Sequence, residues 1–151
     1  MIFDGRFSIE TMDENEMKQR TKKFALRVLD LVDSLPRSRS GNVIARQIIR
    51  SGTSVAANYR ALCRAKSRED FINKTKVVEE EADETSLWLD LVVERRLLSA
   101  RRVQPLLSEA DELTAIFVAS RKTAMSRQSR RDLIENRKSK INDPEARNCN
   151  A

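Results

Sequence analysis

The chain has 151 residues, of which 40% are apolar and 34% charged, and its 29 Lys and Arg against 23 Asp and Glu give a formal net charge of +6. This length suits one domain with a single core, and the small numbers of Gly and Pro, three each, are typical of a helical protein. The absence of His excludes Ser–His, Cys–His and His–metal chemistry, and three glycines leave no Gly-rich phosphate loop. We therefore expect no enzyme activity, no cofactor and no metal. Carboxylate or lysine catalysis is the chemistry that the sequence leaves open, and a deep polar pocket with converging carboxylates would indicate it.

The same composition bears on where the protein works. No apolar run approaches the roughly 18 residues that a membrane span needs, and residues 1–10 contain no continuous apolar segment typical of a signal peptide. Cys63 and Cys149 are the two cysteines, which implies no disulfide framework. We expect a cytoplasmic protein that is neither secreted nor membrane-embedded.

The first apolar ladder predicts a helix over residues 13–35. Its members are spaced by four and three residues and share one stripe of the helix: Met17, Thr21, Phe24, Val28, Leu31 and Leu35. Asp13 is a suitable N-cap. Pro36 ends the helix, because the residue before a proline resists the helical conformation, and residues 37–42 are predicted to form a polar loop.

A second helix is predicted over residues 42–66. Its inward-facing positions are Ile44, Ile48, Ser51, Val55, Tyr59 and Leu62. A glycine inside a helix costs about 1 kcal/mol relative to alanine, so we expect a neighbouring backbone to approach Gly52 closely. Asn58, at the edge of the apolar face, is expected to form a hydrogen bond to a neighbouring helix.

Two further ladders follow. Ser67 and Asp70 form a variant of the capping box, and the ladder behind them predicts a helix that reaches Leu97 or Leu98. Its members are Phe71, Thr75, Val78, Ala82, Thr85, Leu89 and Val92. After a short basic turn, Pro105 suits the first turn of a fourth helix. That helix carries the ladder Leu106, Ala110, Leu113, Phe117, Ser120 and Ala124.

Four long helices with short connections predict an all-α protein, an antiparallel up-and-down four-helix bundle over residues 13–124 that follows an N-terminal arm of residues 1–12. After Ala124 the apolar periodicity is lost, and residues 125–151 hold seven basic against four acidic side chains. We predict that residues 125–151 form a basic C-terminal tail that is a frayed helix or disordered.

Charge is strongly segregated between the second and third predicted helices. Residues 34–68 contain eight basic and no acidic side chains, whereas residues 69–90 contain eight acidic side chains and two lysines. A basic helix beside an acidic one favours ordered self-association, and a surplus basic face is available to a polyanion.

Arginines form a stripe on the second helix, within an arc of about 80° opposite the apolar face. They are Arg46, Arg50, Arg60 and Arg64. One interpretation is a phosphate-contacting surface, since guanidinium groups bind phosphates bidentately and release counterions. The other is a solvated or subunit-facing surface, which is the usual role of a charged helix face. No aromatic residue lies among these arginines to stack on bases.

The third helix carries a second apolar flank, about 80–140° from the Val78 stripe. Val77, Trp88 and Leu91 lie on it together with Glu81 and Glu84. An exposed flank with a tryptophan indicates an interaction site, so we predict a homo-oligomer interface here. Glu81 or Glu84 is then expected to meet arginines of the second helix within or across subunits. Alternatively, Trp88 widens the core of its own bundle.

Several segments together resemble a known family. They are Ser34–Pro36, Arg50–Asn58, Ser67–Phe71, Glu81–Thr85, Trp88–Leu89 and Glu109–Leu113. Over residues 18–124 the chain resembles the four-helix-bundle family of bacterial 23S rRNA intervening-sequence proteins, also labelled ribosomal-protein-like. The resemblance implies a ring-shaped homo-oligomer, commonly a pentamer, encoded in some bacteria within insertions of rRNA genes. RNA binding is inferred for the family from gene location and basic surfaces.

The chain departs from the family pattern directly after Asn58. Family members often carry Ile-Ala-Glu-Gly there, where this chain has Tyr59-Arg60-Ala61-Leu62. The change removes an acid and extends the basic helix.

We hypothesise a non-catalytic protein that binds structured RNA through the four arginines of the second helix, with Arg101, Arg102 and the tail as further contacts. The alternative is a scaffold that binds itself and a protein partner and uses no nucleic acid. If Arg50 and Arg60 are buried against acids, the RNA hypothesis is reduced to Arg101, Arg102 and the tail.

Overall fold

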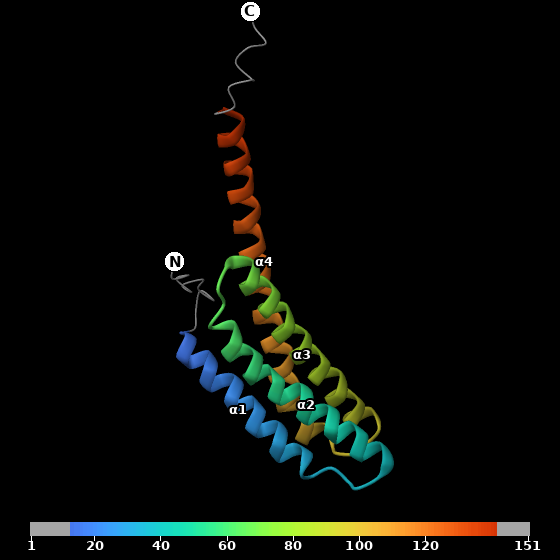
Figure 1. Ribbon diagram of the computed structural model, residues 1–151. Coiled ribbons are helices and arrows are strands. Elements are labelled where there is room, and N and C mark those ends of the chain that lie inside the picture. Colours follow the sequence, from blue (N-terminus) through green and yellow to red (C-terminus); the bar gives the residue numbers. More distant parts are fainter. Residues whose placement is uncertain (1–12, 142–151) are drawn as a thin grey trace, which may run out of the picture.

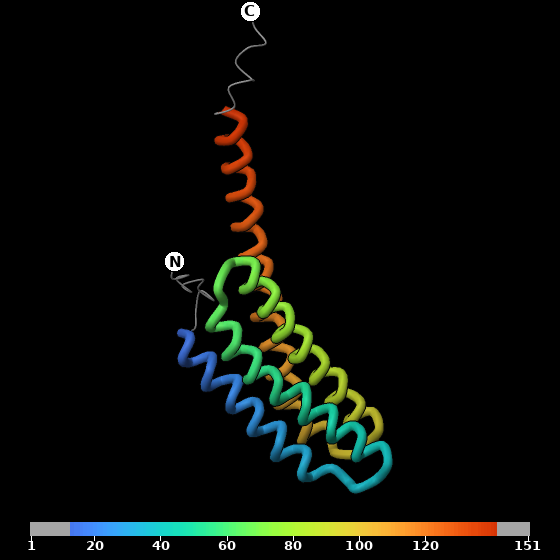
Figure 2. Tube along the Cα trace, in the orientation of Figure 1, coloured from blue at the N-terminus to red at the C-terminus, as the bar shows by residue number. Residues whose placement is uncertain are grey.

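The computed structural model describes residues 13–141, which form four helices (Figure 1). These are α1 (Glu14–Val32), α2 (Arg39–Leu62), α3 (Arg68–Glu94) and α4 (Ala100–Ile141). Successive helices run antiparallel and lie side by side, and α1 also meets α4 over a shorter contact (Figure 2). The predicted all-α, up-and-down four-helix bundle is therefore confirmed, and residues 13–141 contain no strand.

The four predicted ladders form the core. Every predicted member is buried except Ser120, which is half-buried, and Val103 of α4 joins the core as well. Phe24 and Phe117 are the largest fully buried side chains, and the Phe117 ring lies 5.7 Å from the Tyr59 ring, centroid to centroid. Each large apolar side chain buried in this way contributes about 1.5–3 kcal/mol, so the ladders supply most of the stability.

The close approach expected at Gly52 is present, although the neighbour is a side chain and not a backbone. A Cβ at Gly52 would lie 2.7 Å from Cγ2 of Val28 in α1. Any larger residue at position 52 would therefore require the Val28 side chain, or the helix that carries it, to shift.

The hydrogen bond predicted from Asn58 to a neighbouring helix is wrong. Asn58 Nδ2 donates to the Ser54 carbonyl of its own helix at 2.9 Å, because a short polar side chain easily reaches the carbonyl four residues back. A buried polar link between α2 and α3 is formed instead by Ser51 and Thr85, whose hydroxyl oxygens lie 2.9 Å apart.

Two helices begin earlier than predicted, because serines cap them. The Ser38 hydroxyl accepts the Gly41 N–H at 3.0 Å, so α2 starts at Arg39. The Ser99 hydroxyl accepts the Arg102 N–H at 3.3 Å, so α4 starts at Ala100 and includes the arginines assigned to a turn. Pro105 consequently lies inside α4 rather than in its first turn.

The third helix ends earlier than predicted, at Glu94. The Leu97 N–H donates to the Val92 carbonyl at 3.0 Å and the Arg96 N–H to the Val93 carbonyl at 3.0 Å, which is the Schellman pattern of a helix end. Arg96 occupies the left-handed position of this motif, with φ of 56°, where glycine is usual.

The fourth helix also differs from the prediction at its other end. Residues 125–141 form a regular continuation of α4 that projects beyond the bundle, in place of a frayed or disordered segment (Figure 1). The buried positions of α4 nevertheless end with Ala124. A run of good helix formers without Gly or Pro is sufficient for a helix begun inside the bundle to continue. The predictions for residues 1–12 and 142–151 lie outside the described residues.

Arginine–carboxylate pairs join the outer edges of the bundle. Arg20 of α1 donates to both oxygens of Glu109 in α4, at 2.7 and 3.0 Å. Arg121 of α4 donates to both oxygens of Glu79 in α3, at 2.6 and 3.2 Å. No helix formed by residues 13–141 is long and apolar enough to cross a membrane.

Candidate nucleic-acid interface

The outer face of α2 presents three of the four predicted arginines to solvent. Arg46, Arg60 and Arg64 are exposed, and none of them forms an ion pair with another described residue. These three side chains are therefore available to an anionic ligand.

Arg50, the fourth member of the stripe, is engaged within the protomer. Its guanidinium contacts the Glu81 carboxylate at 3.2 Å and also forms an ion pair with Glu84. The pKa of the Glu84 carboxyl is held below its usual value of 4.5, mainly by the hydrogen bond from Arg50 and to a lesser extent by the one from the Trp88 indole. The expected meeting of these acids with an arginine of α2 is confirmed, and it joins α2 to α3 in one chain.

The predicted interface flank on α3 makes several contacts inside its own bundle. Trp88 and Leu91 are half-buried against the core, and Trp88 Nε1 donates to Glu84 Oε1 at 3.1 Å. Val77 remains 39% exposed, and Leu87, which the sequence analysis did not single out, is 54% exposed. Val77 and Leu87 are thus the large apolar side chains of α3 that are exposed.

Arg101 and Arg102 belong to a larger basic region at one end of the bundle. The α1–α2 and α3–α4 connections both lie at this end (Figure 1). Six exposed arginines gather on these connections and the adjoining first turns, and we call them the loop-end patch: Arg37, Arg39, Arg95, Arg96, Arg101 and Arg102. Sequence reasoning missed four of them as site residues, although an up-and-down topology already places the first and third connections at the same end.

Direct contacts hold the two connections of the loop-end patch in place. The Arg102 guanidinium donates to the Ser34 hydroxyl, which ties the start of α4 to the end of α1. A Cβ at Gly41 would lie 2.3 Å from the Pro36 carbonyl oxygen, so the chain folds tightly back on itself before α2. The backbone that carries the arginines is therefore ordered before any ligand arrives.

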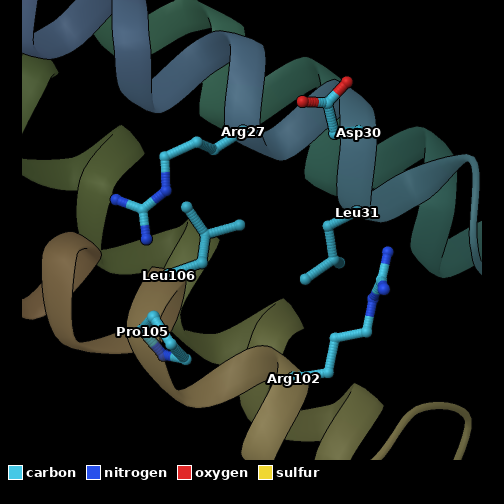
Figure 3. Close-up of a pocket in the computed structure, with 6 residues that line it drawn as sticks. All are labelled: Arg27, Asp30, Leu31, Arg102, Pro105 and Leu106. Carbon is cyan, nitrogen blue, oxygen red and sulfur yellow. The ribbon is translucent and has the colours of Figure 1, made fainter.

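A shallow groove adjoins the loop-end patch between α1 and α4. It has a volume of about 270 Å³. Figure 3 shows Leu31, Leu106 and Pro105 along it, with Arg27 and Arg102 on either side and Asp30 at its upper edge. The groove therefore extends the basic surface along α1 and α4 and gives it an apolar floor.

A second basic region lies at the opposite end, where α4 leaves the bundle beside the start of α3 (Figure 1). Burial lowers the pKa of the Arg68 guanidinium, and the positive charges of Arg131 and Arg127 lower it further. Arg60 and Arg64, near the end of α2, lie at this same end.

The six predicted contact residues do not form one site. At 1.5 Å per residue, Arg60 lies about 32 Å along α2 from Arg39, and Arg64 follows the end of α2, so both are remote from Arg101 and Arg102. The structure instead groups the latter two with the other arginines of the loop-end patch.

The described part of the chain offers little for catalysis or metal binding. No group of three or more acidic or Cys side chains within residues 13–141 could hold a metal ion. Burial raises the pKa of the Cys63 thiol, so at neutral pH it is a protonated and weakly nucleophilic side chain.

Fold and surface together define the class: a small, basic four-helix bundle whose exposed arginines concentrate at its ends. The chain belongs to the family of 23S rRNA-intervening sequence proteins, whose model matches residues 13–119. It is also similar to the crystal structure of a protein of unknown function from the S23 ribosomal protein family of Bacteroides thetaiotaomicron. That match has a TM-score of 0.67 and 32% sequence identity, and covers 74% of this chain and 99% of the other. A search of curated proteins found no match.

Proposed function

We propose that this protein binds structured RNA without catalysing a reaction, and that it does so in the cytoplasm as a ring-shaped homo-oligomer, the pentamer that the family resemblance implies. The observation that carries the proposal is the set of exposed arginines that form no ion pair with other residues of the 13–141 region, notably Arg46, Arg60, Arg64 and the loop-end patch. Guanidinium groups contact phosphates bidentately, and each contact releases counterions from the nucleic acid.

Membership of the family favours RNA over other polyanions. The family takes its name from intervening sequences of 23S rRNA, and the solved relative is assigned to a ribosomal protein family. No aromatic side chains lie among the α2 arginines to stack on bases, so we expect the protein to bind a folded RNA through its phosphates.

Self-association supports the proposal in two ways. Val77 and Leu87 give α3 an exposed apolar surface that a second copy could cover. In a symmetric ring each subunit repeats the same phosphate contacts, so weak binding per subunit becomes useful avidity.

A scaffold that binds itself and a protein partner is the second candidate. It is favoured by the exposed leucines on two different helices, Leu26 of α1 and Leu87 of α3, each 54% exposed. An apolar surface of this kind serves a protein partner as well as a second copy.

The test is the affinity of the full chain for a fluorescently labelled stem–loop RNA at about 50 mM and about 200 mM salt. Phosphate binding predicts a steep fall in affinity between these concentrations. An affinity unchanged by salt contradicts the proposal. An oligomeric protein without measurable RNA binding favours the scaffold.

A further inference from the structure

We infer that the loop-end patch is the principal phosphate-contacting surface of this protein, and that the phosphodiester backbone of RNA is its ligand. This inference rests on the proposed RNA binding, and it places the RNA at the end of the bundle that carries the α1–α2 and α3–α4 connections. Four of the patch arginines, Arg37, Arg39, Arg95 and Arg96, then act as phosphate contacts beside Arg101 and Arg102.

The first argument is that the charge of the patch is not neutralised by direct contact. All six arginines are exposed, and the ion pairs found within residues 13–141 involve none of them. The last turns of α1 and α3 bring four acids to the same end: Asp30, Asp33, Asp90 and Glu94. The arginines outnumber these acids by 6 − 4 = 2. Apart from Arg102, which donates to the Ser34 hydroxyl, their guanidinium groups keep their hydrogen-bond donors for a ligand.

The other basic surfaces are weaker candidates because of how their side chains are arranged, although residues 125–141, with six basic and two acidic side chains, carry the larger net charge. On α2, Arg50 is paired with two glutamates, which leaves three arginines spread along the helix. On the projecting part of α4, Asp132 and Glu135 lie among the basic side chains, and no second element of the described chain packs against its outer turns. Within residues 13–141, the loop-end patch combines arginines from two connections, and the contact between Arg102 and Ser34 joins the first of these connections to the start of α4.

Preorganisation is the second argument. The contact between Arg102 and Ser34, the Ser38 cap and the tight fold at Gly41 order the backbone on both sides of the patch. Fewer degrees of freedom are then lost on binding than with a flexible basic tail.

The third argument is a local conformational cost at one residue of the patch, Arg96. Arg96 has a φ of 56°, a conformation that costs a residue with a Cβ roughly 1 kcal/mol and that glycine adopts freely. Departures of this kind from the locally preferred residue are expected where a side chain serves a function. At position 96 the side chain that carries this cost is an exposed arginine, as expected if its guanidinium contacts a ligand.

Two variants of equal charge test the inference in the full chain. The loop-end variant carries Arg37→Gln, Arg95→Gln, Arg96→Gln and Arg101→Gln, and it spares Arg102 because that side chain holds the connections together. The matched control carries Arg130→Gln, Arg137→Gln, Lys138→Gln and Lys140→Gln on the projecting part of α4. Circular dichroism first confirms that both variants keep the helical content of the parent chain.

The affinity of each protein for a labelled stem–loop RNA is then measured as a function of salt. We expect the loop-end variant to bind about tenfold or more weakly, with a salt slope that falls by about 0.7–0.9 for each phosphate contact removed, and the control to change less. A control that loses as much affinity as the loop-end variant, or more, overturns the inference while RNA binding itself stands. A parent chain that binds no RNA removes the proposed function, and the inference with it.

A third arm distinguishes RNA from an acidic protein as the ligand. Polyglutamate presents carboxylates in place of phosphates, and we expect it to compete for the patch at least tenfold more weakly than unlabelled RNA of equal charge. Polyglutamate that competes as well as RNA, and loses this ability in the loop-end variant, overturns the assignment of the patch to RNA.

Discussion

Arg50 of α2 forms an ion pair with Glu84 of α3 inside a single protomer. The same carboxylate accepts a hydrogen bond from the indole N–H of Trp88, so Glu84 holds both the Arg50 side chain of α2 and the Trp88 side chain of α3. The basic residues of α2 and the acidic residues of α3, which are separated along the sequence, thus partly neutralise each other where the two helices of one chain pack together. Arg50 therefore stabilises the bundle, and the other exposed arginines are the ones available to a polyanion.

This pairing predicts how stability depends on pH. The folded state holds the pKa of Glu84 below its usual value of 4.5, so its stabilising effect is complete above about pH 4.5 and is lost as the pH falls through the lowered pKa. We expect Glu84→Gln to lower the melting temperature at pH 7 and to reduce the further loss between pH 5 and about pH 3. Glu80→Gln, on the exposed face of α3, is the control. Identical pH profiles for the parent and Glu84→Gln would contradict this role.

The close contact between Gly52 and Val28 predicts a large effect from one methyl group. Because a Cβ at position 52 would lie 2.7 Å from the Val28 side chain, we expect Gly52→Ala to destabilise the bundle by about 1–3 kcal/mol, despite the better helix propensity of alanine. Urea denaturation measures the free energy of unfolding. In the Val28→Ala background the same substitution should cost much less, and equal costs in both backgrounds would show that the contact is unimportant.

The conformation of Arg96 predicts a stabilising substitution with a functional cost. Arg96→Gly should raise the free energy of unfolding by about 1 kcal/mol, because glycine adopts a positive φ without a Cβ penalty. Arg96→Gln removes the same charge and keeps the penalty, so it serves as the control for RNA binding. If Arg96→Gly is no more stable than Arg96→Gln, the left-handed conformation carries no measurable cost.

The projecting part of α4 is predicted to be dispensable for folding. The buried positions of α4 end with Ala124, so a chain that stops after that residue keeps the whole core. We expect its melting temperature to lie close to that of the full chain, measured by circular dichroism. A cooperative loss of the bundle on truncation would show that residues 125–151 contribute to the core.

The exposed apolar surface of α3 predicts the effect of two substitutions on assembly. Val77→Glu and Leu87→Glu together should shift the protein toward the monomer in sedimentation velocity, because an interface centred there would bury two carboxylates. Leu133→Glu, at a position 61% exposed on the projecting helix, should leave the assembly intact. A monomeric parent chain, or an assembly unaffected by the double substitution, would place the interface elsewhere.

Much of the fold could be predicted because apolar spacing alone specifies which face of each helix is buried. The helix boundaries could not, since they depend on short-range hydrogen bonds such as those of Ser38 and Ser99, which compete with several equally polar neighbours in the sequence. Whether a given arginine is free or paired also escaped prediction. Arg50 and Arg46 look alike in sequence, and only the packing of α2 against α3 places one of them beside glutamates.

The most direct test of the account is the salt dependence of RNA binding by the full chain. We predict that a labelled stem–loop RNA binds with an affinity that falls steeply from about 50 mM to about 200 mM salt, and that the four loop-end substitutions flatten this dependence more than four substitutions on the projecting helix. Binding that ignores salt, or that is equally sensitive to both sets of substitutions, would contradict it.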